Sequence, residues 1–204
     1  MKFQIIAGEL CLDFINTLDN RPEPERWREL VPSYGDLLDW AMQAGALSAA
    51  QSRVLARAAQ AHPKEAAAAR TRAVDFRERL YRIVRAVARN RRAPGNELRA
   101  FNAYLGEALS HLELQAAQKR FRLNWPRTAD LDLVLWPIVR SASNLLTGRD
   151  LTNVRECGAD TCRWLFVDRS KNHSRRWCDM KVCGNRIKAR KFYRRQRTPT
   201  RKPK

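Results

Sequence analysis

The sequence predicts a mostly α-helical protein of the α+β class, in which an α-rich N-terminal domain with a small β-hairpin precedes a short cysteine-rich module. Apolar residues recur at helical spacing through most of residues 1–150. Residues 111–125 instead alternate in two short runs, as the strands of a hairpin do. Four of the five cysteines then fall within 27 residues near the C-terminus. A chain of 204 residues with 44% hydrophobic residues can fold around a substantial core.

The elements of the N-terminal domain follow from local signals. Leu10, Phe14 and Leu18 stand four residues apart and predict a helix with one buried face. Ser33 and Ser48 are of a residue type that caps helix N-termini, and each precedes a helical pattern. The expected elements, in chain order, are a strand at 2–6, a helix at 7–18, a loop at 20–32, helices at 34–45, 49–61, 64–90 and 97–108, the hairpin at 111–125, and a helix at 131–146 that is interrupted or kinked near Pro137.

Positive charge is concentrated toward the C-terminus. The net charge is +19, of which residues 155–204 carry +13 and residues 1–154 carry +6. Such a local excess attracts polyanions, which suits nucleic acid or an anionic membrane surface, although a tail that only promotes solubility is the alternative. No run of about 18 apolar residues occurs, so no membrane-spanning helix is expected. Glu9 and Asp13 interrupt the apolar N-terminal stretch, which argues against a signal peptide and for a cytoplasmic protein.

The clustered cysteines form two pairs of equal spacing. Four residues separate Cys157 from Cys162 and Cys178 from Cys183, and 15 residues lie between the pairs. Two close pairs joined by a short insert can deliver four thiolates to one tetrahedral ion, so we predict a single structural Zn²⁺ bound by these four residues. Two disulfides, inert thiols or an iron–sulfur cluster are the alternatives.

Two further residues bear on this site. His173 is the only histidine in the insert and is an alternative ligand, although we expect it in a hairpin turn. Cys11 lies far away in the sequence on an apolar face, and we expect it to be a small buried hydrophobic residue.

The insert and the residues after it predict a small fold. Residues 164–167 are expected to form one strand, and residues 175–177 the returning strand of a hairpin. Gly184 and Asn185 then allow Cys183 to lie at the start of a final helix. A hairpin followed by a helix that carries a ligand in its first turn is similar to a treble-clef zinc finger. We therefore divide the chain into a helical domain (1–150), a zinc finger (151–197) and a basic disordered tail (198–204).

The run RRWCDMKVCGNR at residues 175–186 resembles the signature of the CGNR zinc-finger family. Its flanks at 165–170 and 188–195 are similar to that family too, except that Arg169 stands where threonine is expected. Residues 12–17, LDFINT, resemble the opening of the ABATE domain, which commonly precedes this finger. Proteins of this kind are described as stress-induced transcription regulators, so the resemblance implies a role in transcription.

The final helix is strongly basic, and only Ile187, Ala189, Phe192 and Tyr193 are left to pack inward. Together with two arginines of the hairpin it is expected to form one cationic surface, suited to a DNA backbone or a major groove. The candidate nucleic-acid-binding residues are Arg175, Arg176, Arg186, Lys188, Arg190, Lys191, Arg194 and Arg195. RNA is an alternative partner, on whose bases Trp177 and Tyr193 could stack, and a zinc-stabilised protein-interaction module is another.

The N-terminal domain offers one candidate ligand pocket. Asp13, Asn16 and Thr17 group on or beside one helical face, and Trp40 could line a cavity beside them. A small-molecule effector is the hypothesis, and helix capping and core packing explain the same residues. We expect no enzyme, because the sequence has no nucleotide-binding or catalytic-triad signature and its three histidines are scattered. The sequence predicts no particular oligomeric state.

Overall fold

The computed structural model describes residues 2–118 and 120–197, and the predicted tail at 198–204 lies outside them. Within this part the protein is mostly helical with small two-stranded antiparallel sheets, as predicted. The helices are α1 (Leu10–Ile15), α2 (Tyr34–Gln43), α3 (Ala49–Ala61), α4 (Pro63–Ala88), α5 (Gly95–Ser110), α6 (Trp136–Thr147) and α7 (Asn185–Arg197). The strands pair as β1 (Leu18–Asp19) with β2 (Arg28–Glu29), β3 (Glu113–Ala117) with β4 (Arg120–Asn124), and β5 (Val154–Glu156) with β6 (Leu165–Val167). Short 3-10 turns are η1 (Pro24–Arg26), η2 (Leu131–Val134) and η3 (Arg149–Asn153), and η4 (Met180–Gly184) is a π-helical turn.

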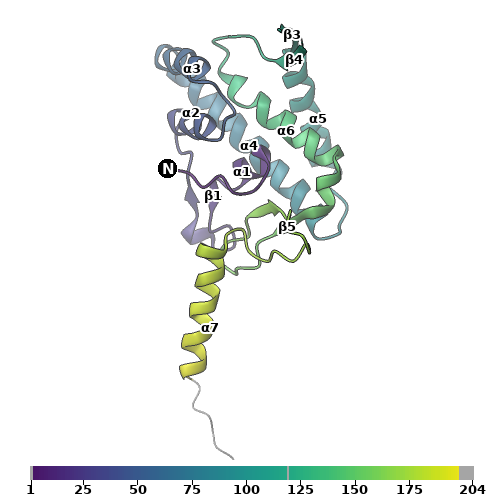
Figure 1. The fold of residues 1–204 in the computed structure, drawn as a ribbon. Helices are drawn as coiled ribbons and strands as arrows, with labels where there is room; N and C mark the ends of the chain where they lie inside the picture. Colours follow the sequence, from purple (N-terminus) through teal and green to yellow (C-terminus); the bar gives the residue numbers. More distant parts are fainter. Residues whose placement is uncertain (1, 119, 198–204) are drawn as a thin grey trace, which may run out of the picture.

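The long helix α4 runs through the centre of the helical body (Figure 1). Its buried residues Ala69, Ala73, Phe76, Leu80 and Ile83 recur at helical spacing, and α4 packs against α1, α2, α3 and α5. The prediction of one amphipathic helix in this segment is confirmed.

Capping side chains fix the starts of two helices. The hydroxyl of Ser33 accepts a hydrogen bond from the N–H of Asp36 (3.1 Å), and that of Ser48 accepts one from Gln51 (3.2 Å). In both cases the second residue also accepts from the serine N–H, which completes a capping box. Gly45, just beyond α2, has φ +73°, a conformation that glycine adopts without strain. Both predicted N-caps are confirmed.

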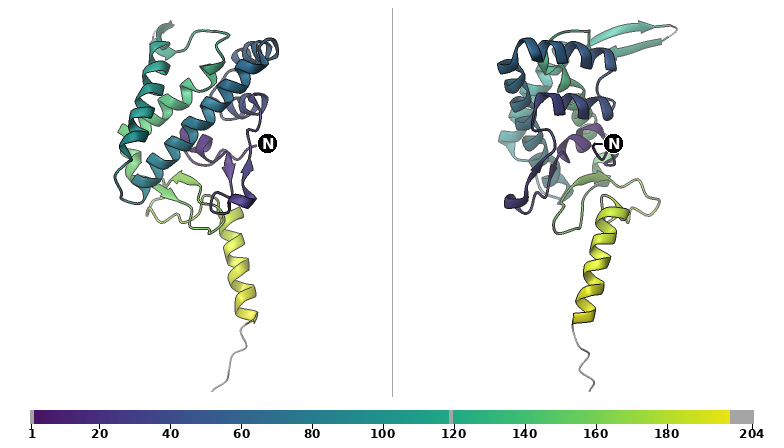
Figure 2. Two further views of the ribbon diagram at one scale, coloured as in Figure 1. Left: turned by 180° about the vertical axis from the view of Figure 1, so that it is seen from behind. Right: turned by 90° about the vertical axis from the view of Figure 1, so that its left-hand side faces the viewer.

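The predicted hairpin is present as β3–β4 and projects from one end of the body (Figure 2, right). Its register pairs Leu114 with Leu123 and Ala116 with Phe121, so these four side chains share one face. That face is open, because Leu114 is 66% and Phe121 73% exposed.

Residues 2–6 do not form the predicted strand. The N–H groups of Ile6 and Ala7 donate to the carboxylate of Asp13 (2.8 and 2.9 Å), and two N–H groups at the start of the chain donate to Gln43 Oε1. Because side chains take the hydrogen bonds that a neighbouring strand would need, the segment pairs with no strand in the described part of the chain.

Two other boundaries differ from prediction. The first helix, α1, ends at Ile15, and the expected loop at 20–32 contributes β2 to a short hairpin with β1. The helix expected from Leu131 begins at Trp136 instead, after the turn η2. Pro137 therefore lies in the first turn of α6, where its missing N–H leaves no helical hydrogen bond unmade, and it does not kink the helix.

The helical body and the C-terminal segment share one hydrophobic core. Leu165 and Phe166 of β6 are fully buried in the same cluster as Phe14 and Ile15 of α1. The N–H of Val167 also donates to the carbonyl of Ala7 (2.8 Å). At the opposite end from the hairpin, α7 departs from the body as a helix that points away from it (Figures 1 and 2). Among the helices of the described residues, none is both long and apolar enough to cross a membrane.

Candidate metal centre

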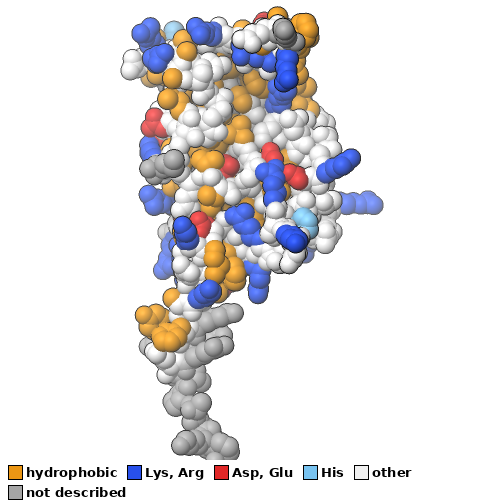
Figure 3. Space-filling view, viewed as in Figure 1, with side chains coloured by type: hydrophobic (Ala, Val, Ile, Leu, Met, Phe, Trp, Pro, Cys, Tyr) orange, Lys and Arg blue, Asp and Glu red, His pale blue; other side chains and the backbone are white. Residues whose placement is uncertain are grey.

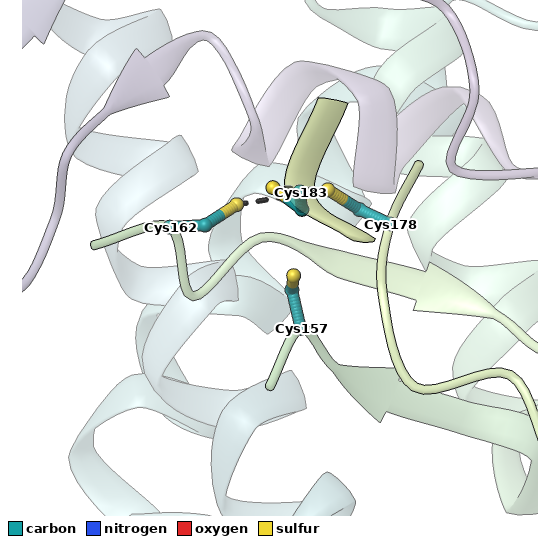
Figure 4. A group of neighbouring side chains, drawn as sticks. All are labelled: Cys157, Cys162, Cys178 and Cys183. Carbon is teal, nitrogen blue, oxygen red and sulfur yellow. Dashed lines mark hydrogen bonds between the residues drawn. The ribbon is translucent and has the colours of Figure 1, made fainter. Parts of the chain in front are cut away.

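The four clustered cysteines converge on one point at the base of α7 (Figure 4). Cys157 follows directly on β5, and Cys162 lies in the turn that leads to β6. Cys178 stands just before η4, and Cys183 lies within it. All four are buried. The structure therefore brings together the full predicted ligand set from two segments of chain.

The distances between the sulfur atoms suit a tetrahedral zinc ion. The four Sγ atoms all lie within 4.8 Å of one another, and Cys178 Sγ is 3.6 Å from both Cys162 Sγ and Cys183 Sγ. Four sulfurs at about 2.3 Å from one zinc ion are separated from each other by about 3.8 Å. A disulfide requires about 2.05 Å, so the cysteines are free thiols here and the disulfide alternative is wrong. Four thiolates also close the coordination sphere, which is typical of a structural site.

Close packing of the thiols changes how readily they ionise. The neighbouring Cys162 thiol lowers the pKa of Cys157, because it donates to the sulfur when Cys157 is the thiolate. The same contact raises the pKa of Cys162, because a second thiolate beside the first is repelled. A cation at the centre removes that repulsion, so the donor set fits a divalent, thiophilic metal.

Backbone hydrogen bonds shape the first cysteine pair. The N–H of Cys157 donates to the carbonyl of Trp164 (2.8 Å), and the N–H of Cys162 to that of Ala159 (3.0 Å). The N–H of Gly158 donates to the carbonyl of Arg176 (2.9 Å), which joins this turn to the segment before the second pair. A side chain at position 158 would approach that same carbonyl to 3.3 Å, so glycine allows the close contact.

The second pair is built by a capped π-turn. Asp179 Oδ1 accepts hydrogen bonds from the N–H groups of Lys181 (2.5 Å) and Val182 (3.2 Å), and its carbonyl accepts one from Gly184. This turn places Cys183 immediately before α7, as predicted, where helix N-terminal amides favour a thiolate.

The second strand predicted at 175–177 is absent. The partner of β6 is instead β5, which lies before the first cysteine pair. The insert between the two cysteine pairs therefore contributes one strand to the small sheet and not two. Asp168 organises the insert instead: its carboxylate accepts from the N–H and hydroxyl of Ser170 and from the N–H of Arg175 (2.6–2.9 Å). Although burial acts in the opposite direction, these bonds keep the pKa of Asp168 below its usual value. His173 Nδ1 contacts the carbonyl of Asp168, and His173 is not part of the metal cluster.

Arginines of the helical body meet the finger beside its first ligand. Glu156, which precedes Cys157, forms ion pairs with Arg89 (2.6 Å), Arg85 (3.6 Å) and Arg163 (3.8 Å). Arg85 lies on α4 and Arg89 directly follows its last residue, so this acidic residue connects the C-terminal end of the central helix to the metal centre. No local signal in the sequence distinguishes Glu156 from the other acidic residues, because its partners Arg85 and Arg89 lie far away in the chain.

The predicted nucleic-acid-binding residues occupy different environments. Arg175 is half-buried within the finger, where Nε donates to the Trp177 carbonyl (3.0 Å) and the guanidinium lies 4.4 Å from the centre of the Phe166 ring. Arg176 is exposed over Trp177. Three further residues are exposed on α7, namely Arg186, Lys188 and Arg190. The side chains of Lys191, Arg194 and Arg195 lie outside the described part of the structure.

The expected inward packing of α7 is only partly observed. Ile187 is half-buried against the core. Ala189, Phe192 and Tyr193 are exposed, because this part of α7 has left the helical body.

The four residues of the predicted ligand pocket are engaged within the fold. Asp13 accepts the two N–H groups described above, and Asn16 hydrogen-bonds the backbone of β6. Thr17 accepts from the buried Arg77 (2.9 Å), and the ring of Trp40 lies 5.0 Å from that of Phe14. The larger described cavities lie elsewhere: one of about 660 Å³ between α3, α4 and the segment at 129–131, and one of about 600 Å³ between α2, α3 and α4. The effector pocket stays a prediction.

Comparison with protein families agrees with this arrangement. The model of the ABATE family, described as "Putative stress-induced transcription regulator", matches residues 8–149. The chain belongs to the ABATE family. The model of the CGNR zinc finger matches residues 153–196, so the resemblance predicted from sequence is confirmed for both segments. No curated protein matches the chain.

The CGNR finger contains all four converging cysteines, and it belongs to a zinc-finger family. Cys157, Cys162, Cys178 and Cys183 are thus positioned to bind one metal ion, and the ion of this finger is zinc. The ABATE match ends at residue 149 and the CGNR match begins at residue 153, and the two segments share a core. The division of the chain into separate domains at 150 stays a prediction.

Proposed function

We propose that this ABATE-family protein regulates transcription by binding DNA through the basic helix α7, which the zinc site holds at its base. The observation that carries the proposal is the composition and position of α7. Its 13 residues include seven Lys or Arg and no acid, and it points away from the body (Figure 1). A helix of this kind repels itself unless anions lie beside it.

The central helix α4 differs from α7, because several of its arginines are neutralised by acidic partners. On α4, Arg72 pairs with Asp132 (2.7 Å) and the buried Arg77 with Glu29 (2.7 Å). Arg82 pairs with Glu97 (2.6 Å). Among the side chains that the structure describes on α7, none has a carboxylate within 4.0 Å. Charge on α4 therefore stabilises the fold, whereas charge on α7 remains available to a partner.

The dimensions of α7 suit a DNA groove. Thirteen helical residues extend about 20 Å, and a major groove about 12 Å wide admits one helix. Phosphates on either side would then contact Arg186, Lys188, Arg190 and the basic residues further along. About six such contacts give a slope of about −5 for log affinity against log salt concentration.

Zinc has a structural role in this proposal. It holds η4 through Cys183 and the residues just before η4 through Cys178, and so sets the direction in which α7 leaves the body. With four thiolate ligands the ion has no open position for a substrate, which supports a binding protein and not an enzyme.

The test is a fluorescence-anisotropy titration of the zinc-loaded protein with random duplex DNA at two salt concentrations. Arg190→Glu with Arg194→Glu changes two residues one helical turn apart on α7, and we expect it to abolish binding while zinc stays bound. The matched control is Arg53→Glu with Arg57→Glu, which makes the same charge change on the exposed side of α3. Equal losses in both variants would show only a general charge effect, and absence of binding at low salt would refute the proposal.

A second candidate is a protein-interaction module, and the open apolar face of β3–β4 favours it. An isolated two-stranded hairpin is marginally stable in water, yet Leu114 and Phe121 expose most of their surface on this one. This candidate predicts that a protein partner is captured after nuclease treatment and is lost with Leu114→Ser and Phe121→Ser. RNA as the partner of α7 predicts tighter binding to RNA than to duplex DNA in the same titration.

A further inference from the structure

Two adjacent aromatic side chains on α7 are exposed to solvent. Phe192 is 58% and Tyr193 64% exposed, and both lie beyond the part of α7 that contacts the body. Figure 3 shows hydrophobic side chains gathered on the projecting helix, away from the rest of the molecular surface. Large aromatic residues are usually buried or bound to a partner, because their exposed apolar surface is unfavourable in water.

The two rings do not shield each other. Their centroids are 5.7 Å apart and their planes meet at 73°, an edge-to-face arrangement. In such a pair the ring faces are not stacked on one another. Successive residues of a helix also point about 100° apart, so the two rings present flat surfaces in different directions.

The charge of α7 decides what kind of partner can cover these rings. In the sequence of α7, seven basic residues precede and follow the two aromatic residues, and no acid is present. A second copy of α7 is an unfavourable partner, because it would bring seven more positive charges alongside. An uncharged apolar surface is unfavourable too, because it would remove water from the basic residues without giving them anionic partners. A nucleic acid supplies both complements, since its phosphates pair with the basic residues and its bases offer flat faces for stacking.

We propose that α7 binds nucleic acid with unpaired bases, on which Phe192 and Tyr193 stack while the basic residues contact the phosphates. This inference rests on the proposed nucleic-acid binding and specifies its substrate. In an intact duplex each base is already stacked on its neighbours, so the two rings gain a partner only where strands are separated or single. Single-stranded DNA and RNA share this chemistry, and an experiment with both distinguishes them.

The experiment compares binding of the full, zinc-loaded chain to oligo-dT, oligo-U and a random duplex, each of roughly 20 nucleotides or base pairs. Oligonucleotides with unpaired bases should bind more tightly than the duplex at equal salt. Phe192→Leu with Tyr193→Leu keeps apolar, helix-favouring side chains but removes both aromatic faces. It should weaken single-strand binding by about 100-fold, that is about tenfold per ring, and leave duplex binding unchanged. Tyr193→Phe is the control that keeps the ring and should bind like the wild type.

The outcomes separate this inference from the function on which it rests. Duplex binding without a preference for single strands, or a leucine variant that loses nothing on oligo-dT and oligo-U, overturns the stacking proposal alone. Absence of binding to every probe overturns nucleic-acid binding by α7, and with it both proposals. Phe192 and Tyr193, the two positions changed to leucine, are exposed on a helix outside the core. An unchanged far-UV circular dichroism spectrum and an unchanged zinc content exclude unfolding as the cause of weaker binding.

Discussion

The side-chain amide of Asn16 pairs with the backbone of Leu165 through two hydrogen bonds, across 149 residues of chain. Its Nδ2 donates to the Leu165 carbonyl (2.9 Å), and its Oδ1 accepts from the Leu165 N–H (3.0 Å). Both residues are buried. Asn16 thus takes the place that a neighbouring strand would have on the open edge of β6, and it fixes the zinc finger to the end of α1.

Asn16→Ala should destabilise the whole protein and not the finger alone. The substitution leaves the N–H and the carbonyl of Leu165 buried without a partner, which costs about 2 to 4 kcal/mol of unfolding free energy. Urea denaturation measures this loss. The control is Asn102→Ala, at an exposed position on α5, which should change stability by less than about 0.5 kcal/mol. Equal stability of the two variants would show that the pairing carries no net energy.

Local signals in the sequence were sufficient for much of the fold and for the metal ligands. Ser33 and Ser48 cap their helices through contacts with residues three positions further along. The spacing of the cysteines likewise indicates two turns, each formed by residues close together in the sequence. Features that depend on distant parts of the chain were not accessible in this way. The Asn16–Leu165 pairing and the contacts of Glu156 with α4 arise only when the helical body has folded.

The errors have the same physical origin. Residues 164–167 do form a strand, but its partner precedes the first cysteine pair, because the sequence pattern shows which residues are extended and not which strand they meet. Phe192 and Tyr193 were expected to pack inward because their apolar character suggests a buried face, and no local signal shows that α7 leaves the body.

The stability of the protein should depend on pH through Asp13. Burial raises the pKa of Asp13 to about 6, although hydrogen bonds from Ala7 and Ile6 oppose the shift. The folded state therefore holds this proton at pH values where the unfolded carboxyl, with a pKa of about 3.9, has lost it. As a result, the contribution of Asp13 to stability falls as the pH rises from about 4 to about 6.

Asp13→Asn removes this titration and keeps an oxygen that can accept both N–H groups. Relative to the wild type, the variant should gain about 1 to 3 kcal/mol of unfolding free energy between about pH 4 and pH 7. Urea denaturation at several pH values in this range measures the difference. A difference that does not vary with pH would mean that Asp13 titrates as it does in the unfolded chain.

Arg169, which stands where the finger family is expected to have threonine, should stabilise the contact between finger and body. Its guanidinium donates to Asp150 (2.6 Å), to Glu9 (2.5 Å) and to the carbonyl of Gly8 (2.9 Å). Because the side chain is half exposed, Arg169→Thr should cost only about 1 kcal/mol. Thermal unfolding at low salt measures this, and in about 1 M salt, where screening is strong, most of the difference should vanish. Arg176→Thr, an exposed arginine with no ion pair among the described residues, should show no such salt dependence.

Zinc should be present at about one ion per chain, and its removal should affect the body as well as the finger. Cys178→Ser removes one of four ligands, so the purified variant should lose most of its zinc, which elemental analysis measures. Leu165 and Phe166 lie in the shared core, and β6 joins directly to the turn that carries Cys162. Loss of the ion should therefore lower the melting temperature of the helical body, and it should abolish DNA binding because α7 loses its fixed base.

Cys11→Ala is the matched control for the zinc experiment. Cys11 is buried, but it stands outside the metal cluster, and burial raises the pKa of its thiol to about 12, so it stays protonated. The substitution should cost about 1 kcal/mol through a small cavity and leave one zinc bound. If Cys178→Ser lost its zinc but melted at the wild-type temperature, Cys178 would be a ligand, and the prediction that the metal stabilises the helical body would be wrong. If the variant still contained one zinc ion per chain, the assignment of Cys178 as a ligand would be wrong.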